Sequence, residues 1–567
     1  MKRKLMAGII VFLALISFEA QGVILESLPE ETFFYFEISN PGSFLSKLNS
    51  FGKEVIGEEV ISQPWRRVEE FLKEIEKFSW DKGKPLVFAV PFWSKDNIFI
   101  FGIENKEKFS GALSGLNLPS PQNYKGMKIY TLPKAKFLFL YKDYVFLGTS
   151  EEILEMTIDF IKGGGRKLFQ FQPFKETKEK LKGDIIFYVN AESIIKYLLP
   201  FLQMMSSMRT PSEGPFSQKM SMIRREKQIK RLQEWERWGG SIALSGDGIH
   251  TYFISKFKEG GEIASSLIST EVRDLSGLLP ADTVFGGWGR YSFSSVAKEM
   301  REFRDEMSKE LEESERALLE KWLKLVDKLK DVYGEEITFA FLGPGKDFVE
   351  DFTQKGELNV EFVEVIQVKD RKEAKAFNKN VEEVIDFLLT LLPGEYKGAV
   401  RLEGVEKEKY KGVEIEGKML IIKFPPKKTA PEGPMMKSPY PKEIKVAIKH
   451  LLYKDYFLIG TGEGVKKTID TLSGGASLTQ DKGYKRVMAK LPSGNSVVYG
   501  SLSKLVKRVV GEIKEVPPSV KEKVEGLVLV PSGAGAVSTV GSKGLVETRA
   551  FWDREDLKVL SVLIQMR

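Results

Sequence analysis

The chain has 567 residues, 42% of them hydrophobic and 29% charged, a balance that is typical of folded globular proteins and excludes intrinsic disorder. Its 86 Lys and Arg nearly balance 79 Asp and Glu, so the charge argues against nucleic-acid binding, which needs a clustered basic surface. The absence of Cys excludes disulfides, thiolate metal sites, Cys nucleophiles and a lipidated Cys anchor. Abundant Lys and Glu give the composition a thermophile-like bias.

The N-terminus has the pattern of a cleavable secretory signal peptide. Residues 2–4 are basic, residues 5–18 are almost entirely apolar, and Ala20 and Gly22 place small residues where a signal peptidase reads. The alternative is an uncleaved anchor, but the apolar run is shorter than the roughly 20 residues that span a bilayer. The sequence therefore predicts an extracytoplasmic mature chain, periplasmic or secreted, that starts near Val23 and has no transmembrane segment.

Short apolar runs separated by turn signals predict a largely antiparallel sheet with packed helices in the first half of the mature chain. Strands are expected at residues 33–38, 86–90, 97–103, 128–132, 137–141, 144–148 and 184–189. Helices are expected from Pro64 to Phe78, from Lys106, and from Thr149 until the glycines at 163–165. A tight hairpin turn is expected at residues 142–143. These elements indicate the α+β class.

An irregular stretch, residues 200–238, is rich first in Met and then in Lys and Arg. We expect an amphipathic helix here, with apolar residues down to Trp238 beneath its basic face. Such a helix predicts an interaction surface for anionic lipid or a polyanionic partner, formed by Met204, Met205, Met208, Arg224, Arg225, Lys227, Lys230, Arg231 and Trp235. The alternative is an ordinary amphipathic helix whose Lys and Arg face water.

Motifs of the first half return in the same order in the second half, which indicates an internal duplication. Residues 28–33 return as 279–284, the Tyr-Lys-Gly at 124–126 returns as 410–412, and Tyr-Lys-Asp-Tyr with Gly-Thr at 141–149 returns as 453–461. The sequence thus predicts two tandem homologous modules, each with a largely antiparallel sheet and packed helices. The expected boundaries are 1–22 for the signal peptide, 23–258 for module one, 259–274 for a linker with Gly260 and Gly261, and 275–567 for module two.

Two features are specific to module two. A stripe of apolar residues at helical spacing from Val296 to Val332 predicts one long helix, the counterpart of the helix at 64–78. Residues 424–441, rich in Pro, Lys and Met, predict a loop inserted into a hairpin.

No set of residues marks a catalytic site. His250 and His450 are the only histidines, and no Gly-x-Ser-x-Gly motif accompanies either one. Zinc needs three or four ligands, which two distant histidines do not supply. The glycines at 163–165 follow a helix instead of preceding one, so they are not a phosphate-binding loop. The sequence therefore leaves any catalytic residue unidentified, and we predict no cofactor and no metal.

The motifs carry one resemblance. The Leu-Pro-x-x-Thr opening at Leu28 and the Tyr-Lys-Asp-Tyr/Gly-Thr units at Tyr141 and Tyr453 resemble the uncharacterised bacterial "domain of unknown function 3352" family of exported proteins. The resemblance covers most of the mature chain. It implies an extracytoplasmic envelope protein without an established activity, and it transfers no catalytic residues.

The sequence favours a non-catalytic envelope protein over an enzyme. Two like modules would form a pseudo-symmetric pair whose shared cleft, or whose Met-rich and basic segment, binds an envelope protein or an anionic surface. An exported hydrolase that uses carboxylates or a metal is an alternative, and it predicts a deep cleft with converging Asp or Glu side chains of shifted pKa. A lipid or hydrophobe carrier is another, and it predicts a continuous apolar cavity inside a module.

Overall fold

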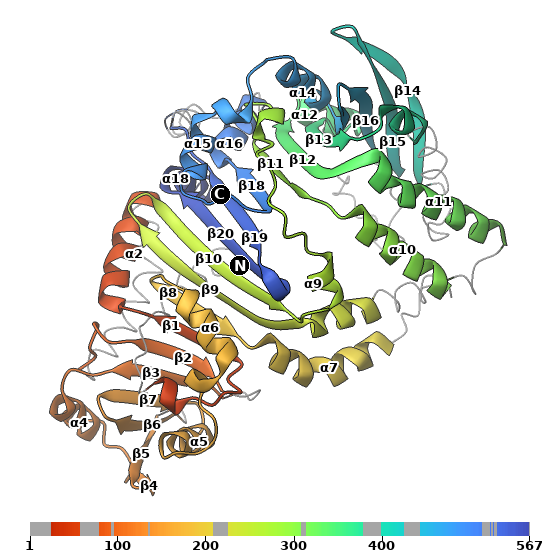
Figure 1. Cartoon of the computed structure of the whole chain (residues 1–567). Coiled ribbons are helices and arrows are strands. Elements are labelled where there is room, and N and C mark those ends of the chain that lie inside the picture. The colour runs from red at the N-terminus through yellow and green to blue at the C-terminus, as the bar shows by residue number, and fades with distance from the viewer. Residues whose placement is uncertain are drawn as a thin grey trace, which may run out of the picture.

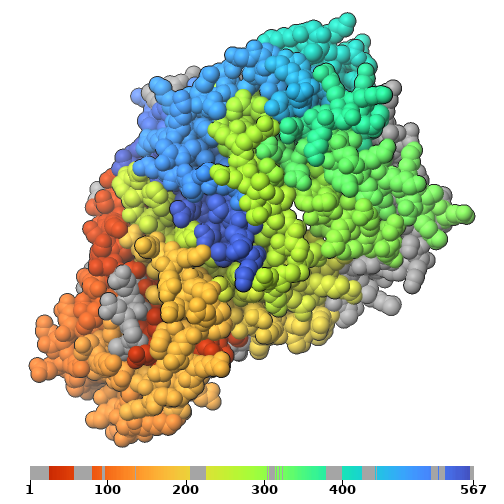
Figure 2. All heavy atoms as spheres, in the orientation of Figure 1, coloured from red at the N-terminus to blue at the C-terminus, as the bar shows by residue number. Residues whose placement is uncertain are grey.

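The computed structural model describes residues 24–56, 79–91, 96–133, 136–207, 225–307, 313–377, 399–423, 441, 443–512, 522, 526 and 530–565. The fold is α+β, with antiparallel sheets and helices packed on them. A long curved sheet runs through the middle of the molecule (Figure 1). The N-terminal strands and helices form a lobe at one end of it, which is also visible as the red and orange part of the surface (Figure 2).

The long sheet joins strands from both halves of the chain. Its described strands, in spatial order, are β1 (Phe34–Ile38), β8 (Ile185–Val189), β9 (Trp235–Ser245), β10 (Gly248–Phe257), β20 (Leu545–Asp553), β19 (Ala534–Val540), β18 (Ser496–Gly500), β11 (Phe285–Arg290), β12 (Tyr333–Pro344), β13 (Val360–Val368), β17 (Tyr456–Thr461), β16 (Glu443–Tyr453), β15 (Val413–Lys423) and β14 (Val400–Tyr410). A second sheet holds β2 (Leu86–Val90), β3 (Ile98–Gly102), β7 (Tyr144–Gly148), β6 (Lys136–Tyr141), β5 (Met127–Leu132) and β4 (Gln122–Tyr124).

The helices lie against these sheets and at their ends. They are α2 (Pro41–Ile56), α4 (Lys106–Ser114), α5 (Glu151–Ile161), α6 (Gln172–Lys180), α7 (Ala191–Ser207), α9 (Glu262–Ser266), α10 (Phe293–Met307), α11 (Glu313–Val332), α12 (Phe348–Glu350), α14 (Gly464–Leu472), α15 (Lys482–Met488), α16 (Leu502–Glu512) and α18 (Arg554–Gln565). Two further helical stretches are 225–233 and 371–377.

The strand order repeats between the two halves. The series β1, β8, β9, β10 is followed in space by β20, β19, β18, β11. In this order β1 corresponds to β11, β8 to β18, β9 to β19 and β10 to β20, so corresponding strands lie on opposite sides of the β10–β20 pair. That pair runs antiparallel, from Gly248 opposite Asp553 to Lys256 opposite Leu545. The order β2-β3-β7-β6-β5-β4 likewise matches β12-β13-β17-β16-β15-β14. The halves are therefore joined by ladder hydrogen bonds in one sheet, where the sequence suggested a cleft.

Local contacts repeat as well. The Leu168 amide donates to the Leu28 carbonyl at 2.8 Å, and the Leu478 amide donates to the Leu279 carbonyl at the same distance. The hairpin turns in the two Tyr-Lys-Asp-Tyr motifs both place Lys in the left-handed region, with φ of 53° at Lys142 and 52° at Lys454. The predicted two-residue turn at 142–143 is thus confirmed, because Tyr141 pairs with Tyr144.

All seven strands expected in the first half are present, with no end shifted by more than one residue, and Ser150 caps α5 through its side chain. The expected helix at 64–78 and nearly all of the expected loop at 424–441 lie outside the described residues. The prediction of one long helix from 296 to 332 is wrong. Two antiparallel helices, α10 and α11, stand there, and Arg304 of α10 pairs with Glu320 of α11 at 3.3 Å. Apolar spacing continues across the reversal, so the pattern did not reveal it.

The two faces of the long sheet differ in their cover. We call them the Phe551 face and the Trp552 face, after two neighbours on β20 that point to opposite sides. The main core lies on the Phe551 face, where α14 and α15 pack over strands of the second half, and Phe551 itself is fully buried there. On the Trp552 face, Phe44 of α2 packs with Leu244 of β9.

Candidate functional site

The residues that the sequence proposed as an interaction surface are dispersed. Met204 and Met205 lie on α7. The helical stretch 225–233 carries Arg225, Lys227, Lys230 and Arg231. Met208 and Arg224 lie outside the described residues. The expectation that Trp235 and Trp238 belong to this helix is wrong, because both lie on β9. Their spacing of three fits a helix, but the glycines that follow Trp238 pair within the sheet.

Two of the predicted basic residues are bound within the chain. Lys227 lies 3.4 Å from Glu302 of α10, and Arg231 pairs with Glu299 of α10 and, at 3.4 Å, with Glu262 of α9. These ion pairs fix the stretch 225–233 to α9 and α10. They also reduce the positive charge that this helix can offer to an anionic surface.

Helix α7 instead carries an exposed apolar stripe. Tyr197, Phe201 and Met204, spaced four and three residues apart, keep 54%, 52% and 50% of their surfaces exposed. This spacing places them on one side of the helix. No charged residue occurs from Tyr197 to Ser207. Sequence reasoning named only Met204 of this stripe, because apolar spacing in a helix usually marks a buried face.

A second group of exposed apolar side chains lies on the Trp552 face. Trp238, Phe285, Val498 and Trp552 are 39%, 44%, 37% and 43% exposed. They belong to β9, β11, β18 and β20, so the group spans the junction between the two halves of the sheet. The sequence signal for it was the unusual mixture of Gly, Ala and Ser with aromatic residues in these strands.

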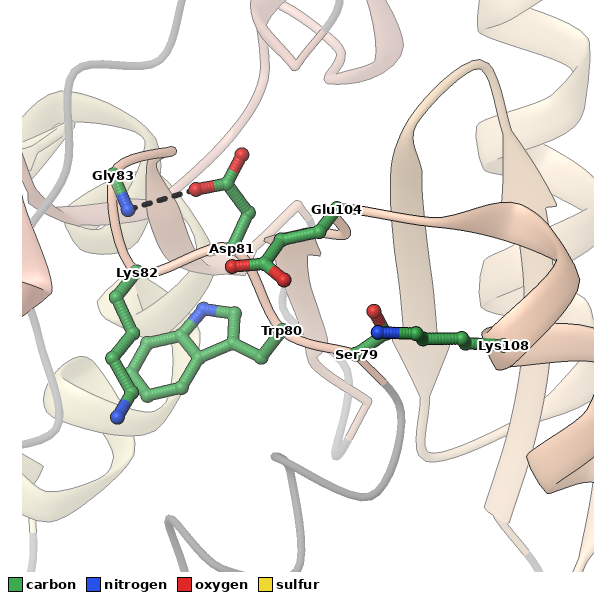
Figure 3. A pocket seen from close by; sticks show the side chains of 7 residues that line it. All are labelled: Ser79, Trp80, Asp81, Lys82, Gly83, Glu104 and Lys108. Atoms are coloured by element: carbon green, nitrogen blue, oxygen red, sulfur yellow. Dashed lines mark hydrogen bonds between the residues drawn. The ribbon is translucent and has the colours of Figure 1, made fainter.

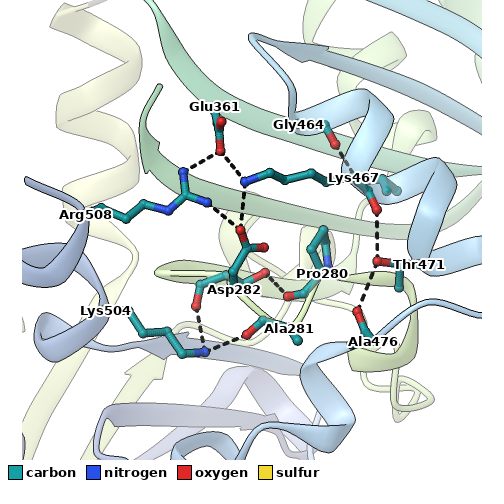
Figure 4. Close-up of polar contacts among 12 residues, drawn as sticks. Pro280, Ala281, Asp282, Glu361, Gly464, Lys467, Thr471, Ala476, Lys504 and Arg508 are labelled. Carbon is teal, nitrogen blue, oxygen red and sulfur yellow. Dashed lines mark hydrogen bonds and ion pairs between the residues drawn. The ribbon is translucent and has the colours of Figure 1, made fainter. Parts of the chain in front are cut away.

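An ionic cluster joins four segments of the second half (Figure 4). Glu361 of β13, 6% exposed, accepts hydrogen bonds from Lys467 at 2.8 Å and from Arg508. The same two cations bind Asp282, Lys467 at 2.8 Å. Burial would raise the pKa of Asp282, but Lys467 and Arg508 outweigh it and hold this pKa below its ordinary value. A carboxylate held ionised between two cations stabilises the fold and is poorly placed to exchange a proton.

Lys504 lies next to this cluster. Its ammonium group donates to the carbonyl oxygens of Ala281 and Thr283 at 2.8 and 3.2 Å, and it pairs with Asp481 at 3.0 Å. Burial lowers the pKa of Lys504, and Asp481 partly opposes this effect. These contacts hold Lys504, and with it α16, against the segment that leads into β11 and against Asp481.

Two buried carboxylates of raised pKa, Asp553 and Asp556, are the strongest acid–base candidates, and both serve as helix caps. Burial raises the pKa of each. Asp553 accepts from the Glu555 amide at 2.9 Å and lies 2.7 Å from Arg486. Asp556 accepts from the amides of Leu502 and Ser503, at the start of α16, at 3.0 and 3.2 Å. Because they are 0% and 3% exposed, a substrate has no direct access to them.

The histidines do not meet. His250 on β10 and His450 on β16 have seven strands between them in the sheet order. His250 approaches Asp247 at 3.4 Å and packs against the ring of Phe551. In the described part of the chain, no group of three or more His, Asp or Glu side chains is arranged to hold a metal ion.

One hollow of about 450 Å³ lies in the N-terminal lobe (Figure 3). It is polar and open, and its lining consists of Ser79, Trp80, Asp81, Lys82, Gly83, Glu104 and Lys108. Trp80 is 4% exposed, and its Nε1 has no hydrogen-bond partner among the described residues. Asp81 turns back to accept from the Gly83 amide at 2.9 Å. The hollow therefore offers surface charges, among them the carboxylates of Asp81 and Glu104, around a buried indole.

Comparison with known proteins adds little. No protein-family model and no curated protein matches the chain. Among solved structures, crystal forms IV, III and I of TP0453 align with 8%, 10% and 9% identity and a TM-score of 0.24. These alignments cover 41–42% of this chain and 79–80% of TP0453. Within the described residues, no helix combines the length and apolarity needed to cross a membrane.

Proposed function

We propose that the chain is an exported, non-catalytic protein of the cell envelope that docks on a membrane surface through α7. The observation that carries the proposal is the exposed stripe of Tyr197, Phe201 and Met204 on a charge-free length of helix. Apolar side chains on one side of a helix are the means by which interfacial helices enter the headgroup layer of a bilayer.

The size of the stripe favours a lipid surface over a protein partner. Three large side chains, each about half exposed, present about 300 Å² of apolar surface. A stable protein interface buries about 800 Å² on each partner, so the stripe alone is too small for one. A bilayer needs no such area, because each side chain that enters it contributes independently. Since Lys227 and Arg231 are bound to acidic residues, we expect anionic lipid to add little.

Other parts of the proposal have separate support. The basic and apolar start of the chain supports a cleaved signal peptide and an extracytoplasmic location. The matched strand orders and the repeated Leu28/Leu279 contacts support two homologous modules. The carboxylates of Glu361, Asp553 and Asp556 accept hydrogen bonds from other groups of the chain. This supports a non-catalytic role over that of a carboxylate hydrolase.

Replacing Phe201 by Ser is expected to weaken membrane docking without harming the fold. Moving about 100 Å² of aromatic surface out of water is worth about 2 kcal/mol, which corresponds to roughly thirtyfold in partitioning. The measurement is co-sedimentation of the mature chain, from residue 23, with phosphatidylcholine vesicles, with and without phosphatidylglycerol.

Tyr291→Ser is the matched control, because Tyr291 is 48% exposed but lies away from α7, between β11 and α10. The control should bind vesicles like the unaltered chain. Failure of the unaltered chain to sediment with either vesicle, or equal losses in the two variants, would refute docking through α7. A strict need for phosphatidylglycerol would instead mean that electrostatic attraction, which we expect to be minor, dominates.

A further inference from the structure

Helices α7 and α16 begin in the same way in the two halves of the chain. Helix α7 follows β8 and α16 follows β18, at matched places in the strand orders. The residues just before these helices are Asn190 and Ser501. Each accepts, through its side chain, from the third amide of its helix, at 3.2 Å from Ser193 and at 3.4 Å from Lys504. The two helix starts can therefore be compared amide by amide.

The first two amides of these helices differ in their partners. In α16 the amides of Leu502 and Ser503 each donate to one carboxylate oxygen of Asp556, at 3.0 and 3.2 Å. In α7 the corresponding amides belong to Ala191 and Glu192, and no group in the described part of the chain accepts from them. Amides at the start of a helix have no intrahelical partner and attract negative charge. The start of α7 thus lacks the carboxylate that α16 takes from its own chain.

Two buried polar side chains stand beside the start of α7. The Tyr188 hydroxyl and the Nε atom of Arg237 are buried without a hydrogen-bond partner among the described residues, and the two residues are only 1% and 8% exposed. Tyr188 lies opposite Gly239 of β9, two residues from Arg237, so both side chains point to the same face of the sheet. The Nη2 atom of Arg237 donates to Glu176 at 2.6 Å, which leaves its Nε–H for another acceptor.

The surroundings of Tyr188 place its hydroxyl near the first turn of α7. Burial raises the pKa of Tyr188, the positive charge of Arg237 opposes this effect, and the negative charge of Glu192 adds to it. Both charged side chains therefore lie within electrostatic reach of the hydroxyl. Tyr499 and Gly533 hold the corresponding places of Tyr188 and Arg237 in the second half. A Cβ on Gly533 would approach the Tyr499 hydroxyl at 3.1 Å, so the Arg237 side chain leaves β9 close to the hydroxyl of its own tyrosine.

We propose that these four groups, two amides, one hydroxyl and one guanidinium N–H, bind the carboxylate of a small molecule at the start of α7. All four can donate hydrogen bonds, and hydrogen bonds to a charged acceptor are the stronger ones. The nearby cations Arg237, Lys196 and Lys258 are each paired with a glutamate, so the site has no surplus positive charge and favours a singly charged ligand over phosphate. Ala191 and Glu192 are partly exposed, so the ligand can enter from solvent.

The test is a titration of the mature chain, carrying isotope-labelled alanine, with sodium acetate at constant ionic strength. We expect the amide resonance of Ala191 to shift until it saturates, whereas sodium chloride should give no saturating shift. Tyr188→Phe should weaken acetate binding about tenfold, because it removes one hydrogen bond to a charged ligand. It should not harm the fold, since the hydroxyl that it removes has no partner in the described chain. Tyr499→Phe is the matched control, because it removes the corresponding hydroxyl of the second half and should leave the acetate affinity unchanged.

Arg237→Met gives a second readout and should also weaken acetate binding, and its partner Glu176 is exposed enough to tolerate the loss. The proposal would be overturned by the lack of a saturating shift with acetate, by equal weakening in Tyr188→Phe and Tyr499→Phe, or by tighter binding of inorganic phosphate than of acetate. The site is independent of docking through the exposed stripe of α7. Phe201→Ser should therefore leave the acetate titration unchanged even though it impairs vesicle binding.

Discussion

Replacing Phe551 by Ala is expected to destabilise the fold by about 4 kcal/mol, whereas replacing its neighbour Trp552 by Ala should cost about 1 kcal/mol or less. Phe551 is fully buried in the main core beside Tyr499 and Val537, so its loss leaves a cavity. Trp552 is 43% exposed on the opposite face and loses less buried contact. Urea unfolding followed by far-ultraviolet circular dichroism measures both effects without depending on the Trp signal.

The pair also tests the register of β20. A slip of one residue would exchange the two side chains between the faces. Equal losses in the two variants, or a larger loss for Trp552, would therefore contradict the pairing of β20 with β10 and β19.

The second large effect is expected at the ionic cluster. Glu361→Ala should destabilise the chain by about 3 kcal/mol. Lys467 and Arg508 are both largely buried, and without Glu361 the two cations would have to share the single carboxylate of Asp282. The matched control is Glu403→Ala, which removes an exposed pair with Arg401 at 3.0 Å and should cost less than about 1 kcal/mol. Similar urea midpoints for the two variants would show that the cluster contributes no more than a surface ion pair.

The cluster also predicts how stability depends on pH. The pKa of Asp282 is lower in the folded chain than its unfolded value of about 4. The stability that it contributes is therefore complete above about pH 4 and is lost as the pH falls through the lowered pKa. Asp282→Asn should make the acid limb of the stability profile shallower. An unchanged slope in a urea series between neutral and acidic pH would rule out this assignment.

The local elements could be predicted from sequence because their signals are local. Short apolar runs indicated β7 and β8, a two-residue gap predicted the turn at Lys142, and Ser150 indicated the start of a helix. The reversal between α10 and α11 and the start of β9 at Trp235 were missed. In both, a spacing that suits a helix is equally compatible with the true structure.

The long-range features could not be predicted. The pairing of β10 with β20 depends on two strands almost three hundred residues apart, and no local pattern specifies it. The cluster around Glu361 assembles from four segments in the same way. Of the proposed interaction surface, Met204 lies in the exposed stripe of α7, and Lys227 and Arg231 form internal ion pairs that the sequence alone did not indicate.

The most direct test of the whole account is native mass spectrometry of the full chain, expressed with its leader and purified gently from the envelope fraction. We predict a chain that starts at Val23 and has no metal ion bound. A chain that starts at Met1, or one that carries a bound metal ion, would contradict the proposed exported, non-catalytic protein of the cell envelope.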